Sequence, residues 1–155
     1  MTATTPQHPT APEEARRRAR MAEGCVGQAL AIDEAAMALR EQLTRDVFSV
    51  RRPADVLAAV NPYKDAKEQK TQILDVLECA VRDIMMAQAG RMTLEDAGYA
   101  PQAEAYARAV PLSGGLRLSA AVTRARQMVA SNVSFAAAFE SILLNLTEEY
   151  TQWPW

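Results

Sequence analysis

The sequence contains few of the side chains that most often bind metals or act as nucleophiles. Its one histidine, His8, lies in a tail rich in proline and threonine, where nothing fixes the geometry of the imidazole ring. The two cysteines, Cys25 and Cys79, are far apart in sequence and have neither a histidine nor a CxxC partner nearby. This spacing argues against a zinc site and a disulfide framework, so we expect two reduced thiols in or beside a core.

Motifs that bind phosphate or transfer acyl groups are also missing. The chain has no GxxxxGK[ST] loop and no GxGxxG turn, and a lone tail histidine cannot complete a catalytic triad. Acidic pairs such as Glu148 and Glu149 are adjacent, and helical neighbours point about 100° apart, so we expect a solvated face. We therefore expect no catalytic residue, no metal and no cofactor. An enzyme built on an isolated carboxylate is the remaining alternative.

Charge and hydropathy exclude two further classes of protein. The net charge of −2 is too small for bulk attraction to nucleic acid. No stretch of ~18 apolar residues is present. Residues 1–12 lack the cationic segment and apolar core of a secretory signal, and we interpret them as a disordered tail. We expect no membrane contact and a cytoplasmic location, and a chain that begins this way looks like part of something longer.

The composition instead predicts an all-α helical bundle. Hydrophobic residues make up 49% and charged residues 23%, and good helix formers are plentiful, while alternating apolar and polar runs typical of strands are absent. Apolar residues recur at helical spacing, and glycine and proline break the segment 90–115 into pieces. The expected helices span residues 13–23, 28–48, 53–60, 64–89, 102–109, 116–130 and 135–150. Asn132 is expected to end the penultimate helix, and Ser134 to cap the last.

Two features could contact a partner, an arginine cluster near the start and a pair of tryptophans at the end. The residues are Arg16, Arg17, Arg18 and Arg20, and Trp153 with Trp155. The arginines could bind DNA backbone or an acidic neighbour, or they could form a solvated helix face balanced by nearby glutamates. The indoles could anchor a partner, or they could fold back over the core of this domain.

A helix end, a short loop and a new helix start lie within residues 19–32, ARMAEGCVGQALAI. This segment resembles the second-sensor region of clamp-loader subunits of the AAA+ class, in which an Ala-Glu-Gly helix end precedes a Gly-Arg-Ala-Leu-like start. Gly24, Gly27 and Gln28 stand at the matching loop positions, and Gln28 replaces the arginine. Because glutamine carries no charge for a phosphate, the resemblance implies a degenerate sensor in a subunit that does not hydrolyse ATP.

Two later segments resemble the collar domain of the delta-prime subunit in the same family. Residues 120–146 are similar to its last two helices, and residues 81–90 are similar to its central helix. Arg82 and Asp83 stand at the arginine–aspartate pair of that central helix. The positions that carry the match to the last two helices are Asn132, Val133, Phe139, Glu140, Leu143 and Leu144.

The resemblance as a whole is to the lid end and collar of the delta-prime subunit of the bacterial DNA polymerase III clamp loader. It implies a tail over 1–12, the end of an AAA+ lid (a helical hairpin remnant) with its connection over 13–48, and a helical collar-like domain over 49–155. The implied function is a non-catalytic scaffold that joins subunits of the gamma/tau and delta types for sliding-clamp loading, with only indirect contact to DNA and no small-molecule substrate. The alternative is an unrelated helical protein–protein interaction or regulatory module, whose functional parts would be residues 90–115 and the tryptophan tail.

Overall fold

The structure, a computed structural model, describes residues 12, 34–66, 68–95 and 97–152. These residues contain helices and turns and no strand, which confirms the all-α helical bundle. In chain order the elements are α2 (Glu34–Phe48), the 3-10 helix η2 (Pro53–Asp55), α3 (Val56–Val60), the 3-10 helix η3 (Asn61–Tyr63), α4 (Lys70–Gln88), α5 (Pro101–Ala109), α6 (Leu112–Ala130) and α7 (Phe135–Gln152).

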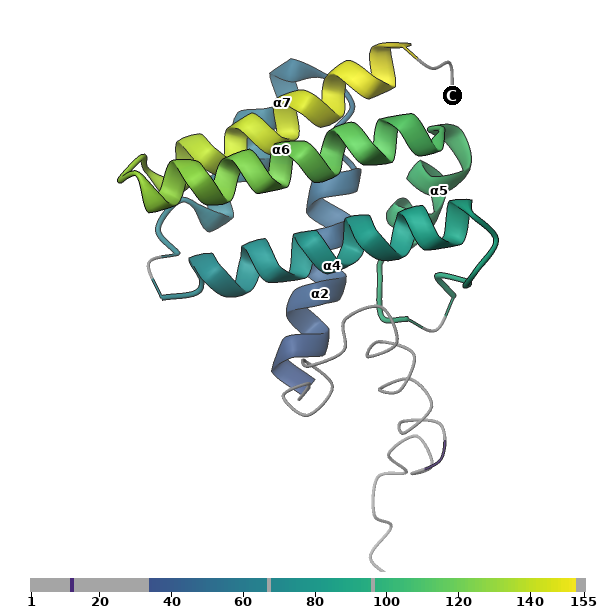
Figure 1. Cartoon of the computed structure of the whole chain (residues 1–155). Coiled ribbons are helices and arrows are strands. Elements are labelled where there is room, and N and C mark those ends of the chain that lie inside the picture. The colour runs from purple at the N-terminus through teal and green to yellow at the C-terminus, as the bar shows by residue number, and fades with distance from the viewer. Residues whose placement is uncertain (1–11, 13–33, 67, 96, 153–155) are drawn as a thin grey trace, which may run out of the picture.

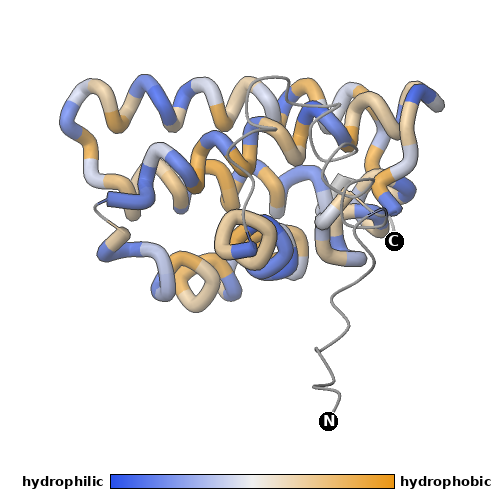
Figure 2. Tube along the Cα trace, turned by 90° about the horizontal axis from the view of Figure 1, so that it is seen from below, coloured by the Kyte–Doolittle hydropathy of each residue, from blue (hydrophilic) through white to orange (hydrophobic). Residues whose placement is uncertain are grey.

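Three long helices, α4, α6 and α7, run alongside one another, and α2 crosses behind them at a steep angle (Figure 1). Helix α6 packs against both α4 and α7 and runs antiparallel to both. Helix α7 also packs against α3, while α2 packs against α4 and α5. Apolar residues recur among polar ones along the described helices (Figure 2), as expected for helices that bury one side. None of the described helices combines the length and apolar character needed to cross a lipid bilayer.

One hydrophobic core joins the helices of this bundle. Its largest fully buried side chains are Phe48 from α2, Ile73, Leu77 and Ile84 from α4, Tyr106 from α5, Leu118 from α6, and Phe139, Ile142, Leu143 and Leu146 from α7, together with Leu43 from α2. The sequence suggested a division between residues 48 and 49. In the structure, the C-terminal half of α2 shares its core with all the helices that follow it.

Three aromatic residues connect α2, α5 and α7 within this core. The ring centroids of Phe48 and Tyr106 lie 5.1 Å apart, and those of Tyr106 and Tyr150 lie 5.9 Å apart in an edge-on arrangement. The Tyr150 hydroxyl donates a hydrogen bond of 2.9 Å to the carbonyl oxygen of Phe48. Because a buried phenol needs a polar partner, this bond fixes the C-terminal end of α7 against the end of α2.

The turn between α6 and α7 follows from its sequence as expected. Asn132 has a positive φ of 64°, a conformation that asparagine tolerates better than most residues. The backbone N–H of Ala137 then donates to the Ser134 hydroxyl over 3.2 Å, as in a helix cap. Helix α5 likewise begins at Pro101, where proline is compatible with a first turn.

The start of α4 was predicted wrongly, at residue 64. The helix begins at Lys70, because Asn61–Tyr63 continue as a 3-10 turn that buries Tyr63. The backbone N–H of Ala66 donates to the Tyr63 carbonyl over 3.1 Å, so the chain is still turning at this point. The turn lets α4 reverse direction and pack beneath α6.

The start of α6 was also predicted wrongly, because Gly114 and Gly115 were interpreted as helix breakers. Both are buried within α6, which begins at Leu112. A Cβ on Gly114 would lie 2.2 Å from Val110 Cγ1 and 2.9 Å from a Glu149 carboxylate oxygen. A Cβ on Gly115 would lie 2.9 Å from Met85 Cγ. The glycines therefore permit a close approach of α6 to its neighbours, which outweighs their low helix propensity.

The expectation of a reduced, structural Cys79 was wrong. Cys79 is buried in α4 with 3% of its surface exposed, and its sulfur is disulfide-bonded. The one other cysteine in the sequence, Cys25, lies outside the described residues. The spacing rule failed because separation along a chain does not limit which residues a helical fold brings together.

Replacing Gly114 with alanine tests the close approach of α6. We expect Gly114→Ala to lower the free energy of unfolding by about 1–3 kcal/mol, because β-branched Val110 cannot easily move away from an added methyl group. Ser113→Ala, an exposed change in the same helical turn, serves as the control and should have little effect. Urea denaturation measures both. Equal stability of the two variants would contradict the proposed crowding.

Candidate functional site

The site residues singled out from the sequence all lie outside the described residues. They are Arg16, Arg17 and Arg20, the loop residues Gly24, Gly27 and Gln28, and the terminal Trp153 and Trp155. Their proposed contacts therefore stay predictions. Within the residues that the structure describes, no group of three or more His, Cys, Asp or Glu is placed to hold a metal ion. The polar features that remain are a buried aspartate, an ion pair with a buried glutamate, and a surface groove.

The buried aspartate, Asp83, lies in α4 with none of its surface exposed. The Tyr99 hydroxyl donates a hydrogen bond to Asp83 Oδ2, whereas Oδ1 has no partner among the described residues. The guanidinium of Arg40, from α2, stacks over the Tyr99 ring at 4.7 Å. These contacts hold the segment before α5 against both α2 and α4.

Backbone groups of the same segment complete this network. Arg40 Nη1 donates to the Ala97 carbonyl over 3.3 Å, and the Ala100 N–H donates to the Thr44 hydroxyl over 3.0 Å. Residues 97–100 contain the positive-φ Gly98, and Ala97 and Ala100 are buried. Buried polar groups of α2 thus provide the hydrogen bonds that water would otherwise supply to this part of the chain.

Burial raises the pKa of the Asp83 carboxyl above its ordinary value of 3.8. The hydrogen bond from Tyr99 and the positive charges of Arg40 and Arg82 act in the opposite direction, but they do not outweigh desolvation. Burial also raises the pKa of Tyr99. A perturbed carboxyl can mark an active site, but the contacts of Asp83 hold a chain segment in place, which gives this residue a structural role.

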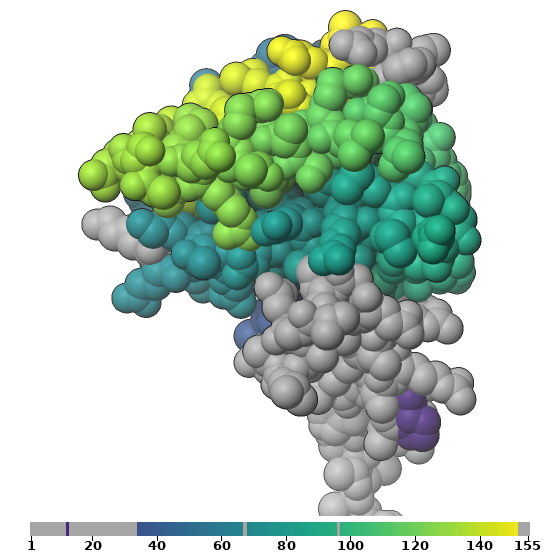
Figure 3. Space-filling model, in the orientation of Figure 1, coloured from purple at the N-terminus to yellow at the C-terminus, as the bar shows by residue number. Residues whose placement is uncertain are grey.

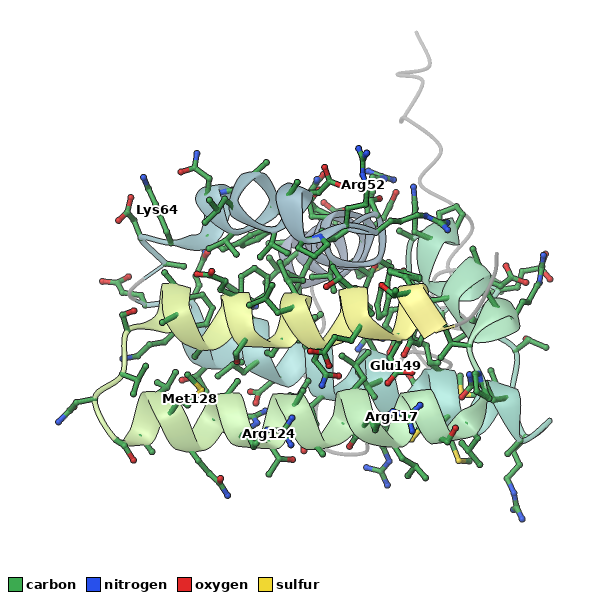
Figure 4. The ribbon with its side chains drawn as sticks, turned by 90° about the horizontal axis from the view of Figure 1, so that it is seen from above. Arg52, Lys64, Arg117, Arg124, Met128 and Glu149 are labelled. Carbon is green, nitrogen blue, oxygen red and sulfur yellow. The ribbon has the colours of Figure 1, made fainter. Side chains whose placement is uncertain are left out.

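An ion pair joins Arg117 of α6, whose side chain is 45% exposed, to the buried Glu149 of α7. Glu149 is 2% exposed, and Arg117 donates to both carboxylate oxygens, through Nη2 over 2.9 Å and through Nε. The two side chains point toward one another between α6 and α7 (Figure 4). The expectation that Glu148 and Glu149 share a solvated face was therefore wrong for Glu149, because a bidentate arginine from another helix satisfies its charge.

A groove lies between the C-terminal half of α6 and the N-terminal half of α7. It has a volume of about 390 Å³ and is open to solvent. We call it the α6–α7 groove. It is lined by Ala121, Arg124, Gln127, Met128, Ser131, Val133 and Ser141. Helix α6 runs along the front of the molecule between α7 and α4 (Figure 3).

Sequence reasoning missed the α6–α7 groove. Met128 is partly buried against the hydrophobic core, and it also lines the groove. Arg124 and Met128 lie farther along α6 than Arg117, toward the turn, whereas Arg52 and Lys64 lie on the opposite side of α7 (Figure 4). The sequence offered no clear signal, because Val133 is a single apolar residue in a turn, and single apolar residues are common on protein surfaces.

No protein-family model matches this chain, and no curated protein and no solved structure matches it either. Its function therefore has to be inferred from its own residues and their contacts.

The pH dependence of stability tests the buried Asp83. A raised pKa means that the folded chain binds this proton more tightly than the unfolded chain does. The stabilisation is therefore complete below pH ~3.8 and is lost as the pH rises through the raised pKa, by about 1.4 kcal/mol for each pH unit between the unfolded and folded pKa values. Asp83→Asn has no such proton. The free energy of unfolding of the wild type minus that of Asp83→Asn should fall as the pH rises above about 3.8 and level off above the raised pKa.

The measurement is urea denaturation across this pH range, and Tyr99→Phe provides a second comparison. Its missing hydroxyl normally lowers the pKa of Asp83, so the same difference measured in the Tyr99→Phe background should continue to fall to a higher pH and reach a larger total. A difference between wild type and Asp83→Asn that does not change with pH would contradict the raised pKa of Asp83.

Breaking the pair between Arg117 and Glu149 should destabilise the hairpin of α6 and α7. Arg117→Ala removes both hydrogen bonds that Arg117 donates to the buried Glu149 carboxylate, so we expect a clear fall in Tm. Arg108→Ala removes an exposed pair with Glu104 and serves as the matched control, for which the fall should be small. Thermal unfolding followed by circular dichroism compares the two. Equal losses would mean that Glu149 does not depend on Arg117.

Proposed function

We propose that this chain is a non-catalytic scaffold of a DNA polymerase III clamp loader, similar to the lid end and collar of its delta-prime subunit. The observation that carries the proposal is the position of the segments that resemble the family. Residues 81–90 form the C-terminal end of α4 and the turn after it, and residues 120–146 span most of α6 and α7. These helices pack directly on one another, as parts of one collar domain would have to.

The arginine–aspartate pair in α4 has a role that fits a scaffold. Arg82 is exposed, whereas Asp83 is buried and accepts a hydrogen bond from Tyr99. The Asp83 carboxylate therefore attaches the chain between α4 and α5 to α4, and it is not accessible at the surface. A buried, hydrogen-bonded aspartate of this kind supports a structural role in a collar domain.

Assembly with sister subunits would be the work of this scaffold. Its partners would be subunits of the gamma/tau and delta types, and DNA would be contacted through them. Exposed apolar side chains suited to such contacts include Leu57 on α3 and Leu116 on α6, at 70% and 57% exposure. A stable interface would need to bury about 1,000 Å² or more.

A cytoplasmic location belongs to the same proposal. The disulfide at Cys79 is the observation that weighs against it, because disulfides are uncommon in reducing compartments.

The alternative, an unrelated helical interaction module, assigned function to residues 90–115 and to the tryptophan tail. Leu94, Tyr106 and Val110 of that segment are buried in the core, so the segment supports the fold. A specific observation that favours a binding role of some kind is the α6–α7 groove, which does not belong to that segment.

Co-elution tests the scaffold proposal. The purified chain, mixed with gamma/tau-type and delta-type subunits, should elute with them in size-exclusion chromatography as one complex. Deleting residues 153–155 distinguishes the scaffold proposal from the alternative of a module that binds through its tryptophans. The scaffold should still assemble with the loader subunits, whereas a module that binds through its tryptophans would lose its partner and keep its fold. Elution as a separate species in every mixture would refute the proposal.

A further inference from the structure

The α6–α7 groove combines an apolar floor with hydroxyl and amide groups at its rim. Met128 lies in it, and the Ser141 hydroxyl contacts the Met128 sulfur at 3.7 Å. The flexible, polarisable side chain of methionine adapts to apolar groups of different shape. Val133, at the turn, is 38% exposed, so an apolar side chain bound there would contact both residues.

A second exposed apolar side chain extends the groove along α7. Leu144 is 40% exposed and follows Ser141 by three residues, so the two share one face of the helix. The apolar surface therefore runs from the turn for about one helical turn beyond the groove. An extended segment with two apolar side chains would fit this length.

The charge among the lining residues of the groove is positive and comes from one arginine. Arg124 is the one charged side chain among its lining residues, and it is exposed. No described acidic residue forms an ion pair with it, in contrast to Arg117, which binds Glu149, and Arg126, which binds Asp75 and Glu78. Arg124 therefore has its full hydrogen-bonding fork available to a ligand.

The two helix ends beside the groove add little net charge. Helix α7 begins at Phe135 with no acidic residue in its first turn, and the carbonyl end of α6 at Ala130 offsets the positive end of the α7 dipole. Ser131 and Val133, which line the groove, lie in the turn directly before this helix end. The attraction of the groove for an anionic group therefore comes from the Arg124 guanidinium.

We propose that the α6–α7 groove binds a short peptide segment of a partner protein in which acidic side chains flank apolar ones. A carboxylate would pair with Arg124 in bidentate geometry, and leucine-like or phenylalanine-like side chains would contact Met128, Val133 and Leu144. The groove volume of about 390 Å³ accommodates a few side chains. This inference does not rest on the clamp-loader proposal.

Two other occupants fit the groove less well. A nucleic acid would need several cations to displace the counterions of its phosphates, and the groove supplies one, Arg124. In a symmetric pair of copies, each groove would present its unpaired Arg124 to the same surface of its partner, and these like charges would repel across the axis. An acidic–apolar peptide matches both the charge and the apolar floor.

Two peptide pools test this proposal by fluorescence anisotropy. The acidic pool consists of fluorescein-labelled heptapeptides that carry Asp or Glu beside Leu, Ile or Phe, and the basic pool replaces each acid with lysine. The acidic pool should bind saturably and the basic pool should not. Binding should weaken as the salt concentration rises, because the carboxylate contact is exposed to solvent.

Matched variants locate the binding. Arg124→Glu and Val133→Asp should each weaken binding of the acidic pool at least about tenfold, a change of roughly 1.4 kcal/mol in binding free energy. Arg91→Glu lies past the end of α4, at the opposite end of the bundle from the groove, and Leu116→Asp lies near the start of α6. Both exposed control variants should bind as the wild type does. Circular dichroism checks that every variant is folded.

Several results would overturn the proposal. These are equal binding of both pools, full binding by Arg124→Glu, and the absence of saturable binding to the wild type. Self-association that Arg124→Glu abolishes, detected by sedimentation velocity, would overturn it too, because the groove would then be an interface between copies of this chain.

Discussion

The close approach of α6 to α4 and α7 is the constraint on which the rest of the structure depends. Neighbouring side chains leave no room for a Cβ at two positions of α6. Val110 and Glu149 lie against Gly114, and Met85 lies against Gly115. This approach brings Arg117 within reach of Glu149. Farther along the same helix pair, the residues are larger and the surfaces separate into the α6–α7 groove.

Buried polar contacts determine how the connecting segments attach to these helices. The hydroxyl of Tyr150 binds the end of α2, and Asp83 with Arg40 holds the chain that precedes α5. Each contact links elements that are distant in sequence. Because a buried polar group is costly unless it is paired, these few contacts select one arrangement of helices among the many that apolar packing alone would allow.

The two proposals rest on two surfaces of different character. The layer of α4, α6 and α7 contains the segments that resemble a clamp-loader collar, and large contacts with sister subunits would extend over exposed side chains such as Leu57 and Leu116. The α6–α7 groove is small, positively charged and suited to a short segment. A scaffold with both would hold large partners together and also bind a peptide, and neither role requires the other.

For the described residues, the sequence by itself determined the helices and most of their ends. Apolar spacing identified the stripe of α7 that includes Phe139 and Leu143, while Asn132 and Ser134 marked the turn before it. These features depend on neighbours within about one or two helical turns, which a sequence displays directly.

The tertiary structure alone decided the rest. Glu149 is buried because an arginine 32 residues away reaches it, and Gly114 is helical because another helix lies too close for a side chain. The disulfide at Cys79 and the α6–α7 groove likewise depend on which elements meet. Local periodicity tells which face of a helix is apolar, but it does not tell what that face will contact. The burial of a charge, a close approach or a groove is therefore set by packing between distant segments.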